Sequence, residues 1–530
     1  MAQGDSAGAD VGSGLTGARR DAALASLCAL LFLTFLDNTI ISVTLADVQS
    51  RIHAGVTALQ WVVNGYALVF AGLMLTAGTL SDIFGRKKVM LAGVGIFCAG
   101  SVIGAVAPTP GVLIAGRVVM GIGAAASEPG TLSMIRHIYP DRAERARAIG
   151  VWAAVSGLAL ALGPVIGGVL VGLSSFRLVF WFNLAFGAVA GIVAGLVLPE
   201  NSDPGARQLD VPGFLLGSAA LVCVTFAVIS GENSGYSNPG IIGLFAASAV
   251  TGVGFLLVER RSRYPVLQLE LFRNPTFAGA NFVSFAAYFG TFSIFFFVAL
   301  YLLLLTSTTP YGIAVDFLPM SAGMILASVF AGRWVAATGP RLPMVIGCVM
   351  AGAGIVVTDG VISPSAGFGS LAGPLALAGV GFGIAVVPVT SSVLAVVPAR
   401  RSGMAASTTN TSRELGAVFG VAILGTIVNG QLTTNVIHQL RSEGLGSIAS
   451  LVINALTTGN VTAPNTAGNP SLQNVINKAT AAAENAFAKG LDVALMLSGA
   501  MLLAAGLVAL FTIAARPRPA PEDDSELAPA

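Results

Sequence analysis

The chain has 530 residues, of which 55% are hydrophobic and only 10% are charged. A water-soluble core cannot bury so much apolar surface, so the composition excludes an ordinary soluble protein and indicates that the lipid bilayer is its solvent. The formal net charge of +2 gives no reason to expect a nucleic-acid partner.

Long apolar runs follow one another along the whole chain, separated by short charged stretches or by Pro and Gly. A spanning helix needs roughly 20 mostly apolar residues, and about fourteen runs reach that length. The first run follows Arg19 and Arg20, lacks a small-residue cleavage site and holds an acid at its middle, so we expect a retained helix and not a signal peptide. We predict helices 1 to 14 at about residues 24–46, 58–80, 88–108, 111–135, 147–172, 176–198, 212–231, 239–259, 277–303, 312–337, 342–361, 369–394, 403–430 and 489–514.

The distribution of Lys and Arg predicts the orientation of these helices. If the N-terminus is inside, about 20 of the 27 Lys and Arg residues fall in inner segments and about five in outer ones. Cytoplasmic loops carry such an excess, and an even number of helices places both termini on one side. The sequence therefore predicts a multi-pass protein of the plasma (inner) membrane with both termini cytoplasmic.

A faint internal repeat predicts how the helices are grouped. Gly78 and Gly85 bracket the loop after helix 2, and Gly332 and Gly339 recur at the same spacing after helix 10. This offset pairs helices 1 to 6 with helices 9 to 14, as internal repeats do in many transporters, and leaves helices 7 and 8 as an inserted pair. The predicted regions are a disordered cytoplasmic N-terminus (1–20), a six-helix bundle (21–200), the inserted helices with linkers (201–275), a second six-helix bundle (276–515) and a cytoplasmic tail (516–530).

The second bundle contains a long polar stretch, about 431–488, which the orientation places outside the membrane. A solvated loop of modest order explains its composition. Its segments near 432–456 and 471–488 also have the composition of surface helices, so both interpretations stay open.

The loop after helix 2, GTLSDIFGRKKVM, combines two glycines, an acid and three consecutive bases at the inner membrane face. Gly78 permits close helix contact, Gly85 suits a tight turn, and Asp82 is able to pair with Arg86 or with a helix N-terminus of the other bundle. A basic loop can also serve only to set topology. The string closely resembles the signature loop of the major facilitator superfamily, and the resemblance implies that Asp82 and Arg86 help to gate the inner side.

Other segments match the same family in the same order along the chain. LDNTIISVTLADVQ, with Asp37, resembles the segment that carries a membrane-embedded acid in drug:proton antiporters, and LIAGRVVMGIGAAA, with Arg117, resembles the motif whose buried arginine is implicated in proton transfer. GLALALGPVIGG looks like the antiporter motif, which accompanies exporters, and RSGMAASTTNTSRELGAVFGVAILG resembles a stretch of fourteen-helix drug exporters. The antiporter motif maps to Gly157, Gly163, Pro164, Gly167 and Gly168.

The helix 5 motif also has a physical interpretation that needs no family. Gly163 and Gly167 are four residues apart and permit a neighbouring helix to approach closely. Pro164 removes one backbone hydrogen bond and bends the helix. Ordinary glycine-mediated packing explains the same spacing, so the residues alone leave both readings open.

Charges inside the predicted helices are the strongest functional signal, because a membrane-embedded charge is costly unless it is paired or hydrated. Asp37 lies near the middle of helix 1 and is either a proton site or a structural acid held by neighbours such as Asn38 or Thr39. Arg117 and Glu128 share one face of helix 4, which we expect to line a cavity; Glu128 is a proton site, a substrate contact or a rim residue. In helix 13, Arg413 and Glu414 are expected to form a local ion-pair network.

The leading functional prediction is a proton-coupled exporter of drugs or other small hydrophobic or amphipathic compounds. The alternatives are an exporter of an endogenous lipid or metabolite and, from another class, a polytopic membrane enzyme. The chain has no HExxH and no GxxxxGK[ST] phosphate loop, so we expect no enzyme activity, no cofactor and no metal. The predicted partners are the substrate, protons and the lipid bilayer, and the predicted oligomeric state is a monomer.

Overall fold

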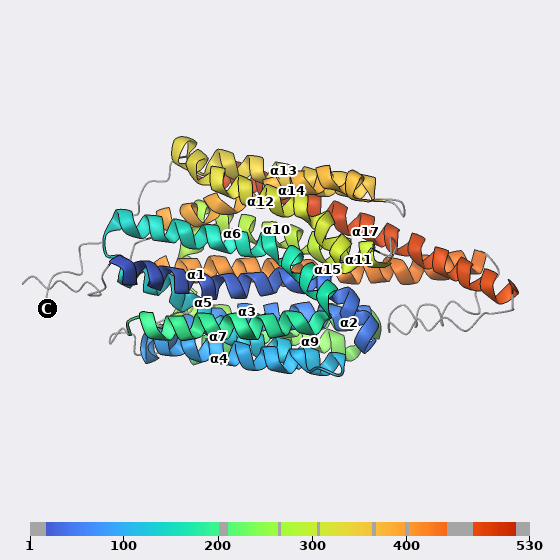
Figure 1. Cartoon of the computed structure of the whole chain (residues 1–530), viewed down its shortest axis with the longest axis horizontal. Coiled ribbons are helices and arrows are strands. Elements are labelled where there is room, and N and C mark those ends of the chain that lie inside the picture. The colour runs from blue at the N-terminus through green and yellow to red at the C-terminus, as the bar shows by residue number, and fades with distance from the viewer. Residues whose placement is uncertain are drawn as a thin grey trace, which may run out of the picture.

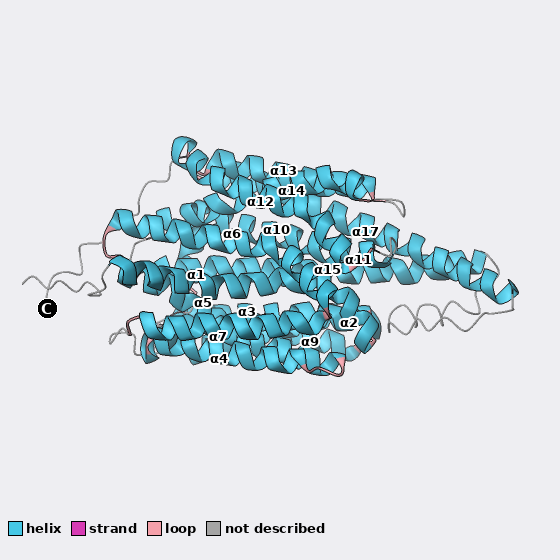
Figure 2. Cartoon of the chain, in the orientation of Figure 1, coloured by secondary structure: helices cyan, strands magenta, loops and turns pink. Residues whose placement is uncertain are grey.

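The computed structural model describes residues 17–200, 210–262, 265, 267–304, 308–362, 367–397, 402–442 and 470–515. This part of the chain is almost entirely helical (Figure 2) and holds no strand. The elements are α1 (Gly17–Ile40), η1 (Ile41–Thr44), α2 (Leu45–Ile52), α3 (Val56–Phe84), α4 (Arg86–Ala105), α5 (Pro110–Ile138), α6 (Arg142–Leu173), α7 (Phe176–Val197), α8 (Val211–Ser234), α9 (Pro239–Arg261), η2 (Leu269–Arg273), α10 (Pro275–Ser293), η3 (Ile294–Val298), α11 (Ala299–Leu304), α12 (Pro310–Thr338), α13 (Arg341–Val361), α14 (Phe368–Ala395), α15 (Ser402–Ser442) and α17 (Pro470–Thr512).

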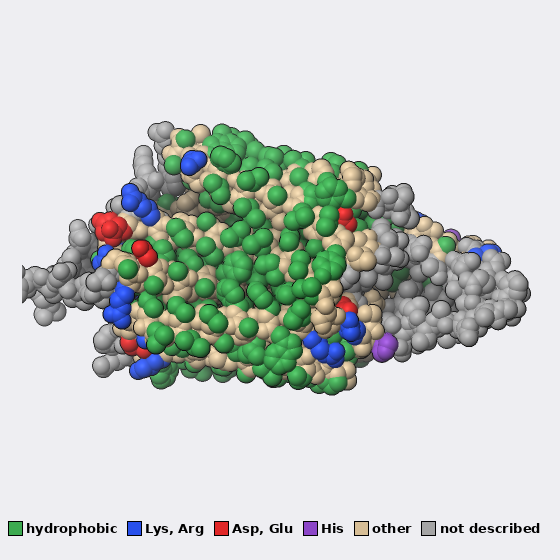
Figure 3. Space-filling view, in the orientation of Figure 1, with side chains coloured by type: hydrophobic (Ala, Val, Ile, Leu, Met, Phe, Trp, Pro, Cys, Tyr) green, Lys and Arg blue, Asp and Glu red, His purple; other side chains and the backbone are tan. Residues whose placement is uncertain are grey.

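Fourteen helices of the described residues are long and apolar enough to cross a membrane, which confirms the predicted all-α polytopic fold. Their side chains form a broad apolar surface in the space-filling view, and charged side chains gather toward its two ends (Figure 3). A belt of this kind is what the hydrocarbon core of a bilayer requires. The chain therefore spans the membrane many times.

The helices pack in two groups, which we define here by their labels. In the N-terminal helix group, α4 packs on α5 and α7, α3 on α5, and α1 on α6 and α7. In the C-terminal helix group, α14 packs on α12 and α13, and α10, α15 and α17 pack on one another. The helices of both groups run roughly along the long axis of the molecule, and the two groups lie beside each other (Figure 1).

The most extensive contacts between the groups are those of α3 with α15 and of α6 with α12. We call the first contact the α3–α15 seam. A Cβ atom on Gly78 would lie 3.9 Å from the Ser407 hydroxyl, and a Cβ atom on Gly425 would lie 2.0 Å from the Gln60 amide nitrogen. Along α3, Gln60 comes before Gly78, whereas along α15 their partners occur in the reverse order, Ser407 before Gly425. The two separations are equal and correspond to about five helical turns. The two helices therefore run antiparallel and are in contact at both ends of this length.

Helices α8 and α9 form a hairpin at the side of this seam. They pack on each other, and α8 also contacts α3 and α15. Most side chains of α9 are partly or fully exposed; the buried ones are Ile241 and Glu259. Helix α8 therefore touches both helix groups at the seam. The proposed regional boundaries, including the division into two bundles with this inserted pair, stay an interpretation of the sequence.

Two helices, α15 and α17, are much longer than a bilayer requires. They have 41 and 43 residues, and they extend beyond the other helices at one end of the molecule (Figure 1). The described ends of the stretch predicted as a polar loop, 431–442 and 470–488, are therefore helical. Residues 443–469, between them, lie outside the described part, as do the predicted N-terminal segment up to residue 16 and the tail from residue 516.

Candidate functional site

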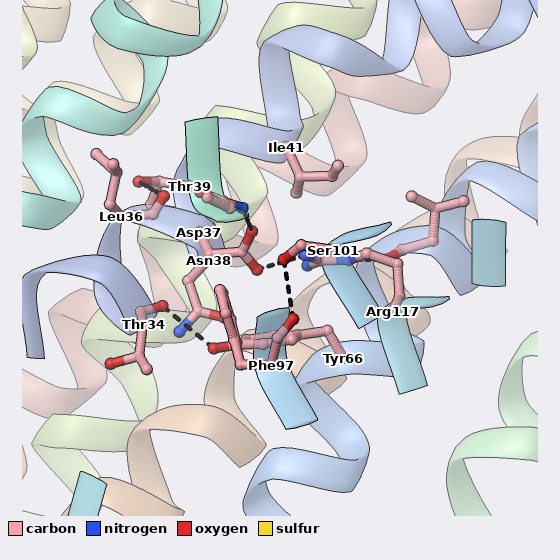
Figure 4. Close-up of polar contacts among 12 residues, drawn as sticks. Thr34, Leu36, Asp37, Asn38, Thr39, Ile41, Tyr66, Phe97, Ser101 and Arg117 are labelled. Carbon is pink, nitrogen blue, oxygen red and sulfur yellow. Dashed lines mark hydrogen bonds and ion pairs between the residues drawn. The ribbon is translucent and has the colours of Figure 1, made fainter. Parts of the chain in front are cut away.

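The buried acid of α1, Asp37, is the centre of a polar cluster in the N-terminal helix group (Figure 4). Its side chain is completely buried. One carboxylate oxygen forms an ion pair with the Arg117 guanidinium of α5, and the other accepts a hydrogen bond of 2.6 Å from the Asn183 amide of α7. Both oxygens therefore have a donor, as a charged group inside a membrane requires. The donors come from other helices and not from the neighbours Asn38 or Thr39.

Arg117 has further partners besides this carboxylate. Its Nε atom donates to the Val62 carbonyl of α3 at 2.9 Å, and its guanidinium lies 4.5 Å from the centre of the Tyr66 ring. The Tyr66 hydroxyl in turn donates to the Thr34 carbonyl of α1 at 3.2 Å. A carbonyl and an aromatic face both stabilise a cation, so Arg117 keeps partners even when Asp37 is neutral.

The two residues after Asp37 connect the same turn of α1 to other helices. The Asn38 amide donates to the Glu414 carboxyl of α15, in the C-terminal helix group, at 3.1 Å. The Thr39 hydroxyl donates to the Leu160 carbonyl of α6 at 3.0 Å. That carbonyl lies four residues before Pro164, which has no N–H to offer it, so Thr39 supplies the missing donor.

The glycines of α6 let this helix pack directly on α1. A Cβ atom on Gly163 would lie 1.9 Å from the Thr39 hydroxyl, and one on Gly167 would lie 2.7 Å from the Ile40 carbonyl. Gly168 is buried as well, whereas Gly157 faces Ser328 of α12 at an ordinary distance of 3.7 Å. The motif thus places a bent, closely packed helix against the turn that carries Asp37.

A second polar cluster lies between the two helix groups. The Asn410 amide of α15 donates to the Glu128 carboxyl of α5 at 2.7 Å. The Asn410 carbonyl accepts a bond of 3.1 Å from Arg413. The other Arg413 nitrogens donate to Thr390 of α14 and Ser284 of α10. All these acceptors are neutral, so no ion pair to Arg413 is present among the described residues.

Arg413 and Glu414 therefore point to different partners, although they are adjacent. Arg413 bonds to neutral groups, and Glu414 accepts from Asn38 across the groups. One oxygen of Glu128 and one oxygen of Glu414 are buried without a hydrogen-bond partner in the described structure. The carboxyl groups of the second cluster are thus only partly satisfied, unlike the Asp37 carboxylate, both of whose oxygens have donors. The face of α5 that we expected to line a cavity is packed here: Gly121, between Arg117 and Glu128, lies against the α3 backbone at Tyr66.

The loop predicted to act as an inner gate joins α3 and α4. Gly85 has φ = 103°, a conformation that favours glycine, and a Cβ atom there would lie 2.6 Å from the Glu200 carboxylate. Glu200 also accepts from the Lys87 backbone N–H at 3.2 Å. Arg86 begins α4 and is partly buried, and Gly78 lies at the end of the α3–α15 seam nearest this loop. The Asp82 side chain lies outside the described side chains.

A small cavity lies at the other contact between the groups. Its walls come from α6, α12, α14 and α15 and include Trp152, Gly157, Ser328 and Arg413. Within the described residues, no three His, Cys, Asp or Glu side chains are placed to hold a metal ion.

Several buried amides of these helices are not predicted from the sequence. Asn183 and Asn410 each bind an acid that was predicted. Gln60 and Asn64 of α3 and Asn429 of α15 are buried as well, and Gln60 lies against Gly425 in the α3–α15 seam. The available signal was the presence of Asn and Gln inside long apolar runs, where an uncharged polar group is also costly. Their partners lie on distant helices, so spacing along the chain does not reveal them.

Comparisons with known proteins relate this chain to one superfamily of membrane transporters and to proteins named for drug or antibiotic resistance. The sequence profile of the Major Facilitator Superfamily matches residues 27–421. The chain is 32% identical over 403 residues to the multidrug resistance protein Stp of Mycobacterium tuberculosis (strain CDC 1551 / Oshkosh), covering 76% of this chain and 75% of the relative. It is 34% identical over 398 residues to the methylenomycin A resistance protein of Bacillus subtilis (strain 168), covering 74% and 84%.

A solved structure supports the fold. The inward-facing, unoccupied crystal structure of a bacterial homologue of the human lysosomal transporter Spinster superposes with a TM-score of 0.59 at 15% identity. The match covers 94% of this chain and 99% of that protein. At this identity the likeness concerns the arrangement of the helices alone.

Proposed function

Because the chain belongs to the major facilitator superfamily, we propose that it is a proton-coupled exporter of drugs or other small hydrophobic or amphipathic compounds. Membership of this family makes the protein a membrane transporter and not an enzyme. The relatives whose names concern resistance to multiple drugs or to methylenomycin A support a drug as the cargo. The GPVIGG sequence in α6, which resembles the antiporter motif of exporters, supports the outward direction.

The buried ion pair between Asp37 and Arg117 carries the proposal of proton coupling. A carboxylate at this depth is stable as long as its cationic partner and the Asn183 amide remain in place. When a proton binds the carboxylate, an O–H bond forms and the attraction to Arg117 is lost. Arg117 then retains the Val62 carbonyl and the Tyr66 ring, so the cluster exists in a protonated and a deprotonated form without exposing a charge to lipid.

Protonation of Asp37 reaches the second helix group through the same turn of α1. Asn38 bonds to Glu414 across the groups, and Thr39 bonds to α6 at the carbonyl freed by Pro164. A shift of this turn when the ion pair opens changes both contacts. Proton binding thereby favours one arrangement of the helix groups over another, which is the requirement for alternating access.

The orientation is part of the proposal. The excess of Lys and Arg on the side of the α3–α4 loop supports a cytoplasmic position for that loop and for both termini. The protons then enter from outside, down their gradient, and the substrate leaves from the cytoplasmic side. Gly78, Gly85 and Arg86, with Asp82, form the proposed inner gate.

Transport in proteoliposomes with an imposed pH gradient tests this function. We expect the wild-type protein to accumulate a drug against its concentration only when the gradient is present. Asp37→Asn keeps the size and the hydrogen bonding of the side chain but fixes it as neutral, so gradient-driven accumulation should stop. Asp316→Asn, a buried acid of α12 outside both clusters, is the matched control and should retain coupling. An unchanged dependence on the pH gradient in Asp37→Asn contradicts the role of Asp37.

A further inference from the structure

The outer part of the α3–α15 seam holds three buried amides that lack partners. Gln60 and Asn64 of α3 are fully buried, and Asn429 of α15 is 3% exposed. Both polar atoms of Gln60 and of Asn64, and the carbonyl oxygen of Asn429, make no hydrogen bond among the described residues. Buried polar groups in native proteins are nearly always paired, and an unpaired group costs free energy.

Gln60 faces α15 across the seam, and Asn64 and Asn429 lie one helical turn from this contact in opposite directions, because α3 and α15 run antiparallel. The Gln60 amide nitrogen lies directly over Gly425, where an added Cβ atom would approach it to 2.0 Å. Asn64 is one turn from Gln60 on α3, and Asn429 is one turn from Gly425 on α15. Residues four apart share a helix face, so the side chains of Gln60 and Asn64 follow one face of α3, and Asn429 follows the face of α15 that meets Gln60.

Charged groups lie elsewhere on these two helices. On α15 the nearest membrane-embedded charge is Glu414, three turns inward from Gly425. Arg117 and Asp37 are occupied by each other and by neutral partners. The side chains next to the amides are apolar and buried, as at Val63, Leu424 and Val428. The outer seam is therefore an uncharged, mostly apolar surface with several hydrogen-bond donors and acceptors.

We propose that Gln60, Asn64 and Asn429 form a substrate subsite that recognises an uncharged hydrogen-bonding group, such as an amide or neighbouring hydroxyls, on an otherwise apolar compound. This inference rests on the proposed export function and assigns it a substrate class. An amide both donates and accepts, so a ligand with both kinds of group satisfies the orphaned atoms. A site built from buried polar groups also rejects ligands that leave those groups unpaired. The position between the two helix groups exposes the subsite when the seam opens.

Binding of two probes to the purified full-length protein tests the subsite. Chloramphenicol is uncharged and carries an amide and two hydroxyls, whereas tetraphenylphosphonium is a lipophilic cation without a hydrogen-bonding group. In the Gln60→Leu/Asn64→Leu variant we expect chloramphenicol affinity to fall by about tenfold or more, and tetraphenylphosphonium affinity to stay within about twofold. The same variant should melt at a higher temperature, because Leu removes unpaired polar atoms from a buried site. Thr358→Val, a buried polar residue of α13 bonded within its own helix, is the control and should change neither affinity.

A pair of glycine variants on α15 gives a second, independent measurement. Gly425→Ala places a methyl group against the Gln60 amide, so chloramphenicol binding should weaken. Gly430→Ala meets no atom within 4 Å and should bind chloramphenicol as the wild type does. The proposal is overturned if wild-type protein does not bind chloramphenicol, if the Leu variant binds it unchanged, or if the Leu variant loses both probes and melts earlier. A protein that binds chloramphenicol at this seam but exports neither probe under a pH gradient contradicts the proposed function and leaves the subsite intact.

Discussion

The Asp37 cluster and the contacts between the two helix groups use similar residues but are satisfied to different degrees. Within the N-terminal helix group, both oxygens of Asp37 have donors, and one of the donors is a cation. Between the groups, Glu128 and Glu414 each accept from one neutral amide and leave one oxygen free. The first cluster is therefore strongly held, and the second is held by weak, separable bonds.

This difference fits the work that each region has to perform in the proposed cycle. Contacts within one helix group persist when the groups move as rigid bodies, whereas contacts between groups must break in every turnover. A neutral amide bound to one carboxyl oxygen costs less to separate than a buried ion pair. In the proposed cycle, the proton site and the interface that moves are therefore different places, joined by one turn of α1.

The largest expected effect comes from breaking the ion pair itself. Arg117→Met removes the guanidinium and leaves a buried carboxylate, which should destabilise the protein by about 3–5 kcal/mol. Glu128→Leu, the matched change between the groups, leaves only a neutral amide unpaired and should cost about 1–3 kcal/mol. Thermal melting of both variants at pH 8 in the same detergent shows which variant loses more stability. Equal losses, or a larger loss for Glu128→Leu, would remove the distinction between the two regions.

The next effect concerns the glycines that place α6 against α1. Gly163→Ala puts a methyl group within 1.9 Å of the Thr39 hydroxyl, so α6 must move, at a cost of about 1–3 kcal/mol together with a loss of transport. Gly157→Ala meets only the Ser328 hydroxyl, at 3.7 Å, and should be nearly neutral. Drug accumulation and melting temperature, measured for both variants, check this. Normal transport by Gly163→Ala would mean that the close contact with the Asp37 turn is not required.

A smaller effect is expected from a single bond between the groups. Asn410→Leu removes the donor to Glu128, worth about 1 kcal/mol, so the open form of the seam should be populated about fivefold more. The rate at which a cysteine at Ser407 reacts with a membrane-impermeant maleimide from the cytoplasmic side reports this opening, in a background without the four native cysteines. Ser498→Ala, whose hydroxyl bonds within α17, is the control and should not change the rate. If the cysteine reacts no faster in Asn410→Leu than in the control, the bond between Asn410 and Glu128 does not hold the seam closed.

The smallest effect lies outside the membrane, where charges contact water. His137 follows the spanning part of α5 (Pro110–Ile135), and burial first, then the charge of Arg86, lowers its pKa from 6.5. The folded state thus binds fewer protons than the unfolded state, so this residue reduces stability as the pH falls below about 6.5 and has no effect at higher pH. His137→Gln should flatten the decline of the melting temperature between about pH 7 and pH 5. An equally steep decline in the variant would show that other groups cause it.

The sequence predicted the fold well because the bilayer imposes a strong and local rule. Fourteen apolar runs of suitable length were expected and fourteen spanning helices are present among the described residues. The embedded residues Asp37, Arg117, Glu128 and Glu414 were also singled out by a local signal, since a charge in an apolar run is rare. Motif resemblance added the family, which the comparisons then showed.

The partners of these residues were beyond the reach of the sequence. Asn38 and Glu414 are 376 positions apart, and Asn410 lies 282 positions from Glu128. Arg413 and Glu414 were expected to form a local ion-pair network, yet their side chains point to different neutral partners, because successive side chains of a helix point in different directions. The helical ends of the stretch around 431–488 were obscured by a polar composition that suits either a loop or an exposed helix.

In the proposed cycle, the proton site and the contact between the helix groups act as one unit through the turn that carries Asp37 and Asn38. A double-mutant cycle tests it most directly, using Asp37→Asn, Glu414→Gln and the double variant, with the initial rate of gradient-driven export as the readout. If the two sites work through one element, the double variant should lose no more activity than the more impaired single variant. Losses that multiply in the double variant would show two independent sites and would contradict the account.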